Sequence, residues 1–325
     1  MHRKSCRDTG RRIPSATVRL IGASAALTAL VAGCGGSPSR HSALPTTTKA
    51  PSPATAPITA KGTTPAAAPA SKPAWIIADW AVAQLQHAAL SPQLVNYFFN
   101  NASTYLIVHP GEKRVDAQLP DATRVQRFTS FVDMQKAFAD GTILPGIKAI
   151  MYDNEAWSFT PANEKDQPIA YATQAEALAH AHGMEAIFTP AANLATLHAS
   201  GSKYSDYLSQ GLAGQGARVA DVFDIQSQQA EATSEFLPFV TQAVSQARAA
   251  NSHAVIMTGI GPNPGGRTVT ASDIMAAYQS TRAEVAGYWL NLPAGNPQCP
   301  QCGKAQPQVA VSFLQSLAQT LGQTS

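Results

Sequence analysis

Two carboxylates that follow one apolar run are the residues whose types and spacing point most directly to chemistry. The run Ile147–Asp153 is typical of a buried strand, and Glu155 and Trp157 come directly after it. Side chains alternate between the two faces of a strand, so Asp153 and Glu155 share one face. Two acids this close repel each other and lose hydration unless a site uses or compensates them. The pair is a candidate for acid–base catalysis. The alternative is two rim acids that cap backbone amides or pair with Arg and Lys.

A general acid must keep its proton near neutral pH, which sets a condition on Glu155. Burial against Trp157 and the negative charge of Asp153 would both raise the pKa of this carboxyl. A mechanism with two protein carboxylates would also need a second acid about 5–9 Å across the site. Asp224 is the first candidate for that acid, and Glu231 is the second.

Short apolar, β-branched or aromatic runs recur along the chain and predict strands that alternate with helices. The predicted strands are Ala74–Trp80, Tyr105–His109, Arg124–Ser130, Ile147–Asp153, Met184–Thr189, Val219–Ile225, His253–Ile260 and Val285–Leu292. The clearest helices are predicted at Ala172–Ala181, Thr233–Ala249, Ala271–Thr281 and Gln308–Leu321, whereas Trp75–Asp79 and Asn96–Asn101 are ambiguous. Alternating strands and helices imply a parallel sheet. Eight strands over roughly 250 residues predict a single (β/α)8 TIM-type barrel at residues 73–325. The alternative is a doubly wound open α/β sheet, although the Gly-rich phosphate turn after the first strand is missing.

In such a barrel, the residues that act lie at the carboxyl ends of the strands. These positions carry amides, a few acids and aromatic rings, a mixture that suits a sugar because rings stack on a pyranose and amides match its hydroxyls. The predicted substrate-binding residues are Arg127, Trp157, Asn193, Gln226, Gln228, Tyr288 and Trp289, and the candidate catalytic acids are Asp153, Glu155 and Asp224. The alternative for Trp157 and Trp289 is a core or rim position. A nucleotide or phosphate site would instead need Gly-rich turns and basic residues.

Acids on the fourth strand, amides on the sixth and a tryptophan on the eighth resemble the chitinase-type, family 18 glycoside hydrolases. That family carries the motif DxxDxDxE on its fourth strand. The resemblance implies that Glu155 is the general acid and that Asp153 orients the acetamido group of the substrate, which acts as an internal nucleophile. It also implies that Trp289 forms the floor of the sugar site and that Gln226 or Gln228 holds the acetamido group or the intermediate.

The match to this motif is partial. Lys148 and Met151 stand where the family has its two earlier aspartates, so the proton relay behind the partner aspartate is missing. The family also contains members that bind sugars without cleaving them. Three functions therefore stay open: a glycoside hydrolase acting on cell-wall or environmental polysaccharide, a non-catalytic carbohydrate-binding protein, and a barrel with a structural or partner-binding role in the envelope. We expect no cofactor and no metal, because the histidines show no pairing at strand ends.

The start of the chain is predicted to be a targeting segment rather than part of the folded domain. Residues 1–33 join a basic segment to the apolar run Leu20–Gly33, which is too short to span a bilayer comfortably and fits a secretory signal peptide. The segment Leu30–Cys34 resembles the bacterial lipobox, which implies cleavage before Cys34 and acylation of this cysteine. The alternative is a plain signal peptide with a chance cysteine. Residues 34–72 form a Ser/Thr/Pro/Ala-rich tract that predicts a disordered tether.

These segments predict a lipoprotein that is anchored at Cys34 to the cell membrane, on its extracytoplasmic face. The chain is also similar to barrel-containing lipoproteins of high-GC Gram-positive bacteria, which implies a location more than a chemistry.

The charge of the predicted barrel argues against a nucleic-acid partner. Ten of the 23 basic residues lie before Pro73, together with one of the 20 acids, so residues 73–325 carry 13 basic and 19 acidic residues, a net charge of −6. A nucleic-acid-binding surface needs a basic footprint instead. Cys299 and Cys302 lie in a Gly/Pro-rich loop and predict a local disulfide in an oxidising compartment. A zinc site would need two more ligands, and no second CxxC exists.

Overall fold

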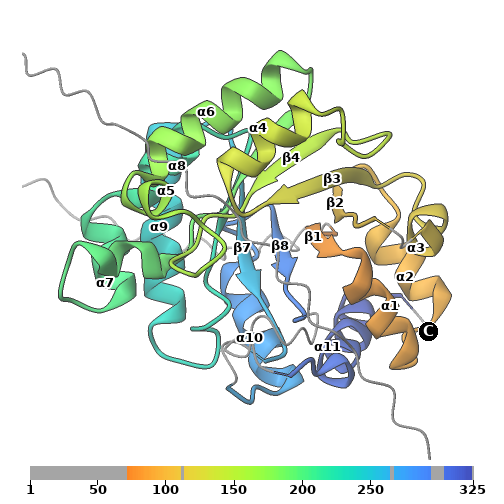
Figure 1. Ribbon diagram of the computed structural model, residues 1–325. Coiled ribbons are helices and arrows are strands. Elements are labelled where there is room, and N and C mark those ends of the chain that lie inside the picture. The colour runs from red at the N-terminus through yellow and green to blue at the C-terminus, as the bar shows by residue number, and fades with distance from the viewer. Residues whose placement is uncertain (1–71, 111–112, 264–266, 294–303, 324–325) are drawn as a thin grey trace, which may run out of the picture. The chain divides into compact units, whose positions relative to one another are not determined.

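Eight parallel strands close into one barrel in the computed structural model, which describes residues 72–110, 113–263, 267–293 and 304–323 (Figure 1). The strands are β1 (Ala74–Ala78), β2 (Thr104–Ile107), β3 (Thr123–Phe128), β4 (Ala149–Tyr152), β5 (Glu185–Phe188), β6 (Val222–Ile225), β7 (Val255–Ile260) and β8 (Gly287–Leu290). Each strand pairs with the next, and β8 pairs with β1 through Trp75 and Tyr288. The predicted (β/α)8 barrel is confirmed. The doubly wound alternative is wrong, because an open sheet would leave its two edge strands unpaired.

Helices surround the ring of strands (Figure 1). They are α1 (Asp79–His87), α2 (Pro92–Phe99), α3 (Lys113–Gln118), α4 (Phe131–Ala139), α5 (Ala162–Asp166), α6 (Pro168–Ala181), the 3₁₀ helix η1 (Ala192–Leu197), α7 (Lys203–Ser209), α8 (Leu212–Arg218), α9 (Phe236–Ala250), α10 (Ala271–Thr281) and α11 (Pro307–Thr320). The helices predicted from sequence correspond to α6, α9, α10 and α11. The two ambiguous segments resolve into β1, which passes directly into α1, and the end of α2.

Strand side chains alternate between the barrel interior and the helix layer. Trp75 of β1 faces outward, where its ring meets Phe98 and Phe99 of α2 at centroid distances of 6.1 and 5.8 Å. Its neighbour Ile76 faces the interior, and both residues are fully buried. Parallel strands that are buried on both faces read as nearly continuous apolar runs, which is why the strands could be found in the sequence.

A buried carboxylate fixes the segment between β4 and α6. Glu164 is fully buried, and its two oxygens accept hydrogen bonds from the backbone N–H of Phe131 (2.7 Å), the Tyr152 hydroxyl (2.8 Å) and the Ser130 hydroxyl (3.2 Å). A negative charge at the first turn of α4 interacts favourably with the helix dipole. Glu164 thereby ties the start of α4 to the loop that carries Glu155.

Within the described ranges, no helix combines the length and the apolar character that crossing a membrane requires. The predicted signal peptide, all but the last residue of the 34–72 tether, the lipidation site Cys34 and the disulfide pair Cys299 and Cys302 lie outside these ranges. They stay predictions.

Candidate active site

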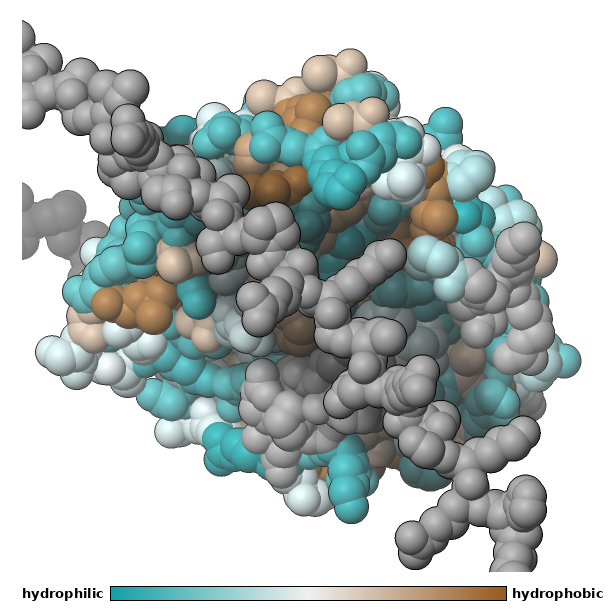
Figure 2. Space-filling view, in the orientation of Figure 1, coloured by the Kyte–Doolittle hydropathy of each residue, from teal (hydrophilic) through white to brown (hydrophobic). Residues whose placement is uncertain are grey.

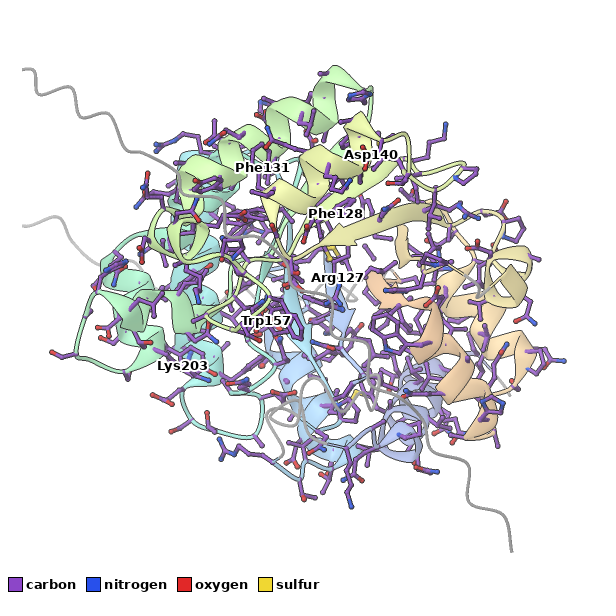
Figure 3. The ribbon with its side chains drawn as sticks, viewed as in Figure 1. Arg127, Phe128, Phe131, Asp140, Trp157 and Lys203 are labelled. Atoms are coloured by element: carbon purple, nitrogen blue, oxygen red, sulfur yellow. The ribbon has the colours of Figure 1, made fainter. Side chains whose placement is uncertain are left out.

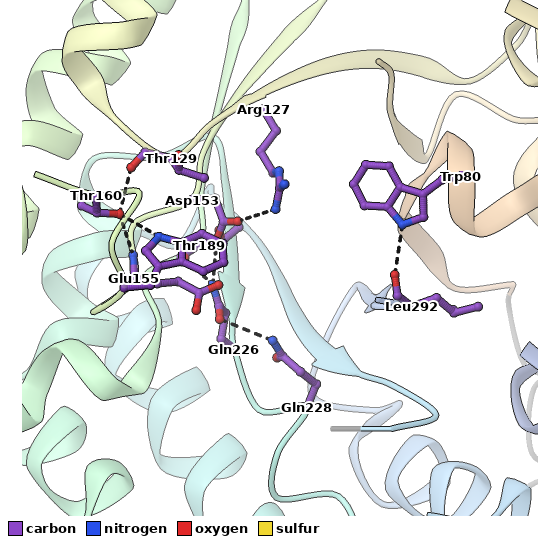
Figure 4. A network of polar contacts seen from close by, with 11 residues as sticks. Trp80, Arg127, Thr129, Asp153, Glu155, Thr160, Thr189, Gln226, Gln228 and Leu292 are labelled. Atoms are coloured by element: carbon purple, nitrogen blue, oxygen red, sulfur yellow. Dashed lines mark hydrogen bonds and ion pairs between the residues drawn. The ribbon is translucent and has the colours of Figure 1, made fainter. Parts of the chain in front are cut away.

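Asp153 is the centre of a polar network at the carboxyl end of β4 (Figure 4). It is fully buried. Its Oδ2 accepts a hydrogen bond from Arg127 Nη1 at 2.9 Å, and its Oδ1 accepts from Thr189 Oγ1 at 3.0 Å and Gln226 Nε2 at 2.9 Å. Both oxygens are therefore occupied within the protein. Asp153 thereby ties together the ends of β3, β4, β5 and β6, and it exposes no surface for the contact with an acetamido group that the family resemblance implies.

Glu155 lies two residues after Asp153, in the loop that follows β4, and is partly exposed. The loop around it is held by Thr160, whose Oγ1 accepts from the Glu155 N–H (3.4 Å) and from Trp157 Nε1 (2.9 Å). Asn193 Oδ1 accepts from the N–H of Ala156 at 3.0 Å. Trp157 is therefore fixed beside Glu155. Asn193, which was expected to bind substrate, has its carbonyl oxygen engaged in positioning this loop.

Burial and charge favour the protonated form of Glu155. Burial raises the pKa of Glu155 to about 8, with a further contribution from the negative charge of Asp153, while Arg127 and a hydrogen bond from Gln226 act in the opposite direction. Burial also raises the pKa of Asp153, opposed by Arg127, Thr189 and Gln226. Glu155 therefore holds its proton at neutral pH, and the direction matches the condition that the sequence set for a general acid.

Two amide side chains enter the site from the segment after β6. Gln226 Nε2 also donates to the carbonyl of Thr189 at 2.7 Å, and Gln228 Nε2 donates to Gln226 Oε1 at 3.3 Å. Gly259 of β7 makes room for Gln228, because a Cβ at this position would lie 2.2 Å from Gln228 Oε1. The amides thus form a chain that runs from Asp153 towards β7 (Figure 4).

Asp224 lies inside the barrel rather than across its mouth. The register Ile187↔Val222 places Asp224 beside Thr189, in the same interior layer as Asp153. It is fully buried, and neither carboxylate oxygen has a hydrogen-bond partner among the described residues. Burial, and secondarily the charge of Asp153, raises the pKa of Asp224 well above its usual value. The structure does not place Asp224 as a second acid at the mouth, because its side chain is fully buried in the barrel interior.

The other candidate for that role, Glu231, is also buried. Its Oε1 accepts the N–H of Gly261 at 2.8 Å, and only 6% of the residue is exposed. Glu155 is thus the acid that the structure presents at the mouth among the carboxylates that the sequence singled out.

The side chains of the two aromatic residues of β8 point to opposite faces of the strand. Tyr288 points into the helix layer, where its hydroxyl donates to the carbonyl of Tyr278 and lies 3.0 Å from Thr281 Oγ1. Its predicted contact with substrate is wrong. Trp289 faces the barrel interior beside Gly259 but is only 4% exposed, so it fills the interior and offers almost no surface for stacking on a sugar.

Three further residues lie at the carboxyl end of the barrel and were not predicted from the sequence. Asp79 and Trp80 follow β1, and His109 follows β2; Asp79 Oδ1 lies 2.9 Å from His109 Nδ1. The Arg127 guanidinium lies 5.8 Å from the centre of the Trp80 ring. The contact between Asp79 and His109 at the strand ends was not predicted from the sequence. The rule that found Asp153 would have found these residues, because they also stand at carboxyl ends of strands.

Part of this face is recessed, and both hydrophilic and hydrophobic atoms of the described residues are visible there (Figure 2). Arg127 and Trp157 lie towards the middle of the ring of strands, whereas Lys203 lies to one side on α7 (Figure 3). Among the described residues, no group of three or more His, Cys, Asp or Glu side chains is arranged to hold a metal ion.

The chain matches no family model and no curated protein. It is similar at low identity to several solved structures, including the following three. One is a glycoside hydrolase family 17 β-1,3-glucanosyltransferase from Rhizomucor miehei, with 8% identity, 71% of this chain and 91% of that chain covered, and a TM-score of 0.40. Another is a putative α-L-fucosidase from Bacteroides thetaiotaomicron, with 9% identity, coverage of 68% and 70%, and a TM-score of 0.40. The third is the HMG-CoA lyase of Bacillus subtilis, with 11% identity, coverage of 79% and 96%, and a TM-score of 0.41. The three differ in activity, and the barrel assignment rests on the strand order and register described above.

Proposed function

We propose that this protein is a glycoside hydrolase that acts on polysaccharides containing 2-acetamido sugars, with Glu155 as general acid. One observation carries the proposal: the Glu155 carboxyl lies beside Trp157 at the carboxyl end of the barrel, where burial raises its pKa to about 8. Catalytic residues of such barrels lie at this end. Asp153 and Asp224 are fully buried, so a nucleophile supplied by the substrate fits better than a second carboxylate.

The proposed reaction has two steps. Glu155 first gives its proton to the glycosidic oxygen while the acetamido carbonyl oxygen bonds to the anomeric carbon and the glycosidic bond breaks. Water then attacks the anomeric carbon, its proton passes to the Glu155 carboxylate, and the bond to the acetamido oxygen opens. The sugar is released with retained configuration, and Glu155 is protonated again.

The neighbouring residues set the conditions for this proton transfer. Burial, and secondarily the charge of Asp153, raises the pKa of Glu155, and Arg127 compensates the negative charge that remains when the proton leaves. Gln226 is oriented by its bonds to Asp153 and Thr189, which leaves its Oε1 for Gln228. Preorganised polar groups of this kind act without a reorganisation cost during the reaction.

The test compares wild type with Glu155→Gln on paired aryl glycosides that differ only in carrying a 2-acetamido or a 2-hydroxyl group. Glu155→Gln should lower turnover of the acetamido substrate by about 10²–10⁴-fold, the usual contribution of a general acid. Glu176→Gln, on the exposed side of α6, is the matched control and should leave turnover unchanged. Equal turnover by Glu155→Gln and wild type, or equal turnover of both substrates by wild type, would contradict the proposal.

A second candidate is a carbohydrate-binding protein without catalysis. It is favoured by the burial of Asp153, since the carboxylate that should orient the acetamido group is fully buried and already accepts three hydrogen bonds within the protein. Glycan binding that persists in Glu155→Gln, together with no turnover by wild type, would select this candidate.

We propose that the protein acts at the extracytoplasmic face of the cell membrane through a lipid on Cys34. The support is the lipobox-like segment Leu30–Cys34 after a basic and apolar leader. In cells fed labelled palmitate, wild type should carry the label and sediment with membranes, whereas Cys34→Ala should do neither. A labelled Cys34→Ala protein would contradict the anchor.

A further inference from the structure

We infer that the rim next to β1 and β2 forms a second sugar subsite, built from Trp80 and His109, so that the ligand is an oligosaccharide rather than a single terminal sugar. This inference rests on the proposed sugar ligand and extends it. The residues concerned form a cluster outside the Glu155 centre, and none of the contacts that shape that centre requires them.

A buried carboxylate fixes the geometry of this cluster. Asp79 is 1% exposed and accepts hydrogen bonds from the backbone N–H of Trp80 and of His109, each at 2.6 Å. Its Oδ1 also lies 2.9 Å from His109 Nδ1. This contact holds the ring in one orientation and assigns Nδ1 as the bound nitrogen, so that Nε2 is left for another partner. The side chain of His109 remains 35% exposed.

The indole of Trp80 is fixed as well. Its Nε1 donates to the carbonyl of Leu292, which follows β8, at 3.1 Å. The His109 ring packs against it with centroids 4.2 Å apart, and the indole remains partly exposed. A rigid, partly exposed indole beside an oriented imidazole is suited to one pyranose: the ring offers an apolar face, and Nε2 can accept or donate a hydrogen bond to a hydroxyl.

Arg127 joins this cluster to the Glu155 centre. Its guanidinium lies 5.8 Å from the Trp80 ring centre, while its Nη1 lies 2.9 Å from Asp153. Trp80 follows β1, His109 follows β2, Arg127 lies near the end of β3, and the Glu155 loop follows β4; these four strands are consecutive in the barrel. Adjacent strands lie about 4.8 Å apart, so the arc from Trp80 to Trp157 covers on the order of 14 Å of rim. That span is longer than one sugar ring, and Figure 4 shows Trp80 and Glu155 on opposite sides of Arg127.

Binding at this second subsite would orient the glycosidic bond that reacts. A sugar held at Trp80 does not react, but it fixes the neighbouring bond relative to Glu155. Interactions with remote parts of a substrate can be used to orient the reacting bond, so short substrates should lose turnover as well as affinity.

The test uses the Glu155→Gln protein, in which bound ligand is not consumed, with Trp80→Ala or His109→Gln added. Calorimetric titration with N-acetylglucosamine, chitotetraose and laminaritetraose measures affinity. Trp80→Ala should weaken binding of the preferred tetrasaccharide by about tenfold or more, which corresponds to about 1.4 kcal/mol. His109→Gln should weaken it less, and the affinity for the monosaccharide should not change in either variant.

Two further variants control for folding. His182 stacks on Phe138 at 4.2 Å in the helix layer, so His182→Gln repeats the loss of a stacked imidazole away from the mouth and should leave affinity unchanged. Trp80→Phe keeps an aromatic ring without the bond to Leu292 and should retain part of the affinity that Trp80→Ala loses. Thermal unfolding of each variant shows whether the barrel is intact.

The outcomes separate this inference from the proposed function. Turnover by wild type with tetrasaccharide binding that is unchanged in Trp80→Ala would overturn the subsite and leave the hydrolase standing. Binding that depends on Trp80 without any turnover would support the subsite and reject the hydrolase. Absence of binding to either tetrasaccharide would overturn both.

Discussion

Replacing Asp224 by asparagine should remove part of the pH dependence of the free energy of unfolding. The folded protein holds this carboxyl in the barrel interior, where neither oxygen has a partner among the described residues and where burial raises its pKa well above the usual value of 3.8. A group with a raised pKa in the folded state contributes its full stability below the pKa of the unfolded chain. That contribution is lost as the pH rises towards the pKa of the folded state.

The size of the effect follows from this linkage. For each pH unit above 3.8 at which Asp224 stays protonated while the unfolded chain ionises, the wild type loses about 1.4 kcal/mol of stability that the asparagine variant keeps. For a chain of this size, that difference is about 3–6 °C in melting temperature per pH unit. Asparagine has nearly the same shape and cannot ionise, so little else changes in the packing.

Thermal and urea unfolding of wild type, Asp224→Asn and Asp140→Asn between pH 4 and pH 8 measures this difference. Asp140 is an exposed acid paired with Lys136, so its replacement makes the same chemical change at the surface and should leave the pH slope almost unaltered. The difference between Asp224→Asn and wild type should grow as the pH rises above 4 and should level off where Asp224 ionises in the folded protein. Parallel curves for these two proteins would refute the reasoning, because Asp224 would then titrate in the folded state as it does in the unfolded chain.

Three more substitutions test separate contacts. Arg127→Gln leaves Asp153 buried without its cation and should destabilise the protein by about 3–5 kcal/mol in urea unfolding, and an unchanged midpoint would contradict the ion pair. Gly259→Ala places a Cβ 2.2 Å from Gln228 Oε1 and should weaken glycan binding. In a Gln228→Ala background, Gly259→Ala should cause no further loss of affinity. An additive loss would show that Gly259→Ala does not act through Gln228. Tyr288→Phe should lower stability by about 1 kcal/mol without changing glycan affinity. A loss of affinity would show that Tyr288 contributes to sugar binding.

The barrel could be predicted from sequence because its strands carry two buried faces. Runs such as the one before Asp153 are apolar on both sides, and helices with apolar positions at helical spacing separate them. The first strand was harder to recognise, because β1 ends at Ala78 and α1 starts at the next residue, Asp79, without any intervening turn residue.

The site was predicted less well, because the pattern of alternation gives the face of a residue but not its depth. Asp224 and Gln226 share a face, yet Asp224 stands within β6 and lies in the sealed interior, while Gln226 stands beyond the strand and bonds to Asp153. Tyr288 and Trp289 are neighbours, so alternation alone excluded that both face one ligand. Asn193 reaches the loop of Glu155 through a tertiary contact, of which the sequence carries no periodic signal.

The proton on Glu155 is the central claim, and the pH dependence of kcat/KM tests it most directly. That profile reports the ionisation of the free enzyme. With an N-acetylhexosamine oligosaccharide as substrate, kcat/KM should fall as the pH rises through about 8, where Glu155 loses its proton. Glu155→Gln should remove this decrease at high pH together with most of the turnover. A wild-type profile that stays flat through this range, or a Glu155→Gln enzyme with the same profile, would contradict the account.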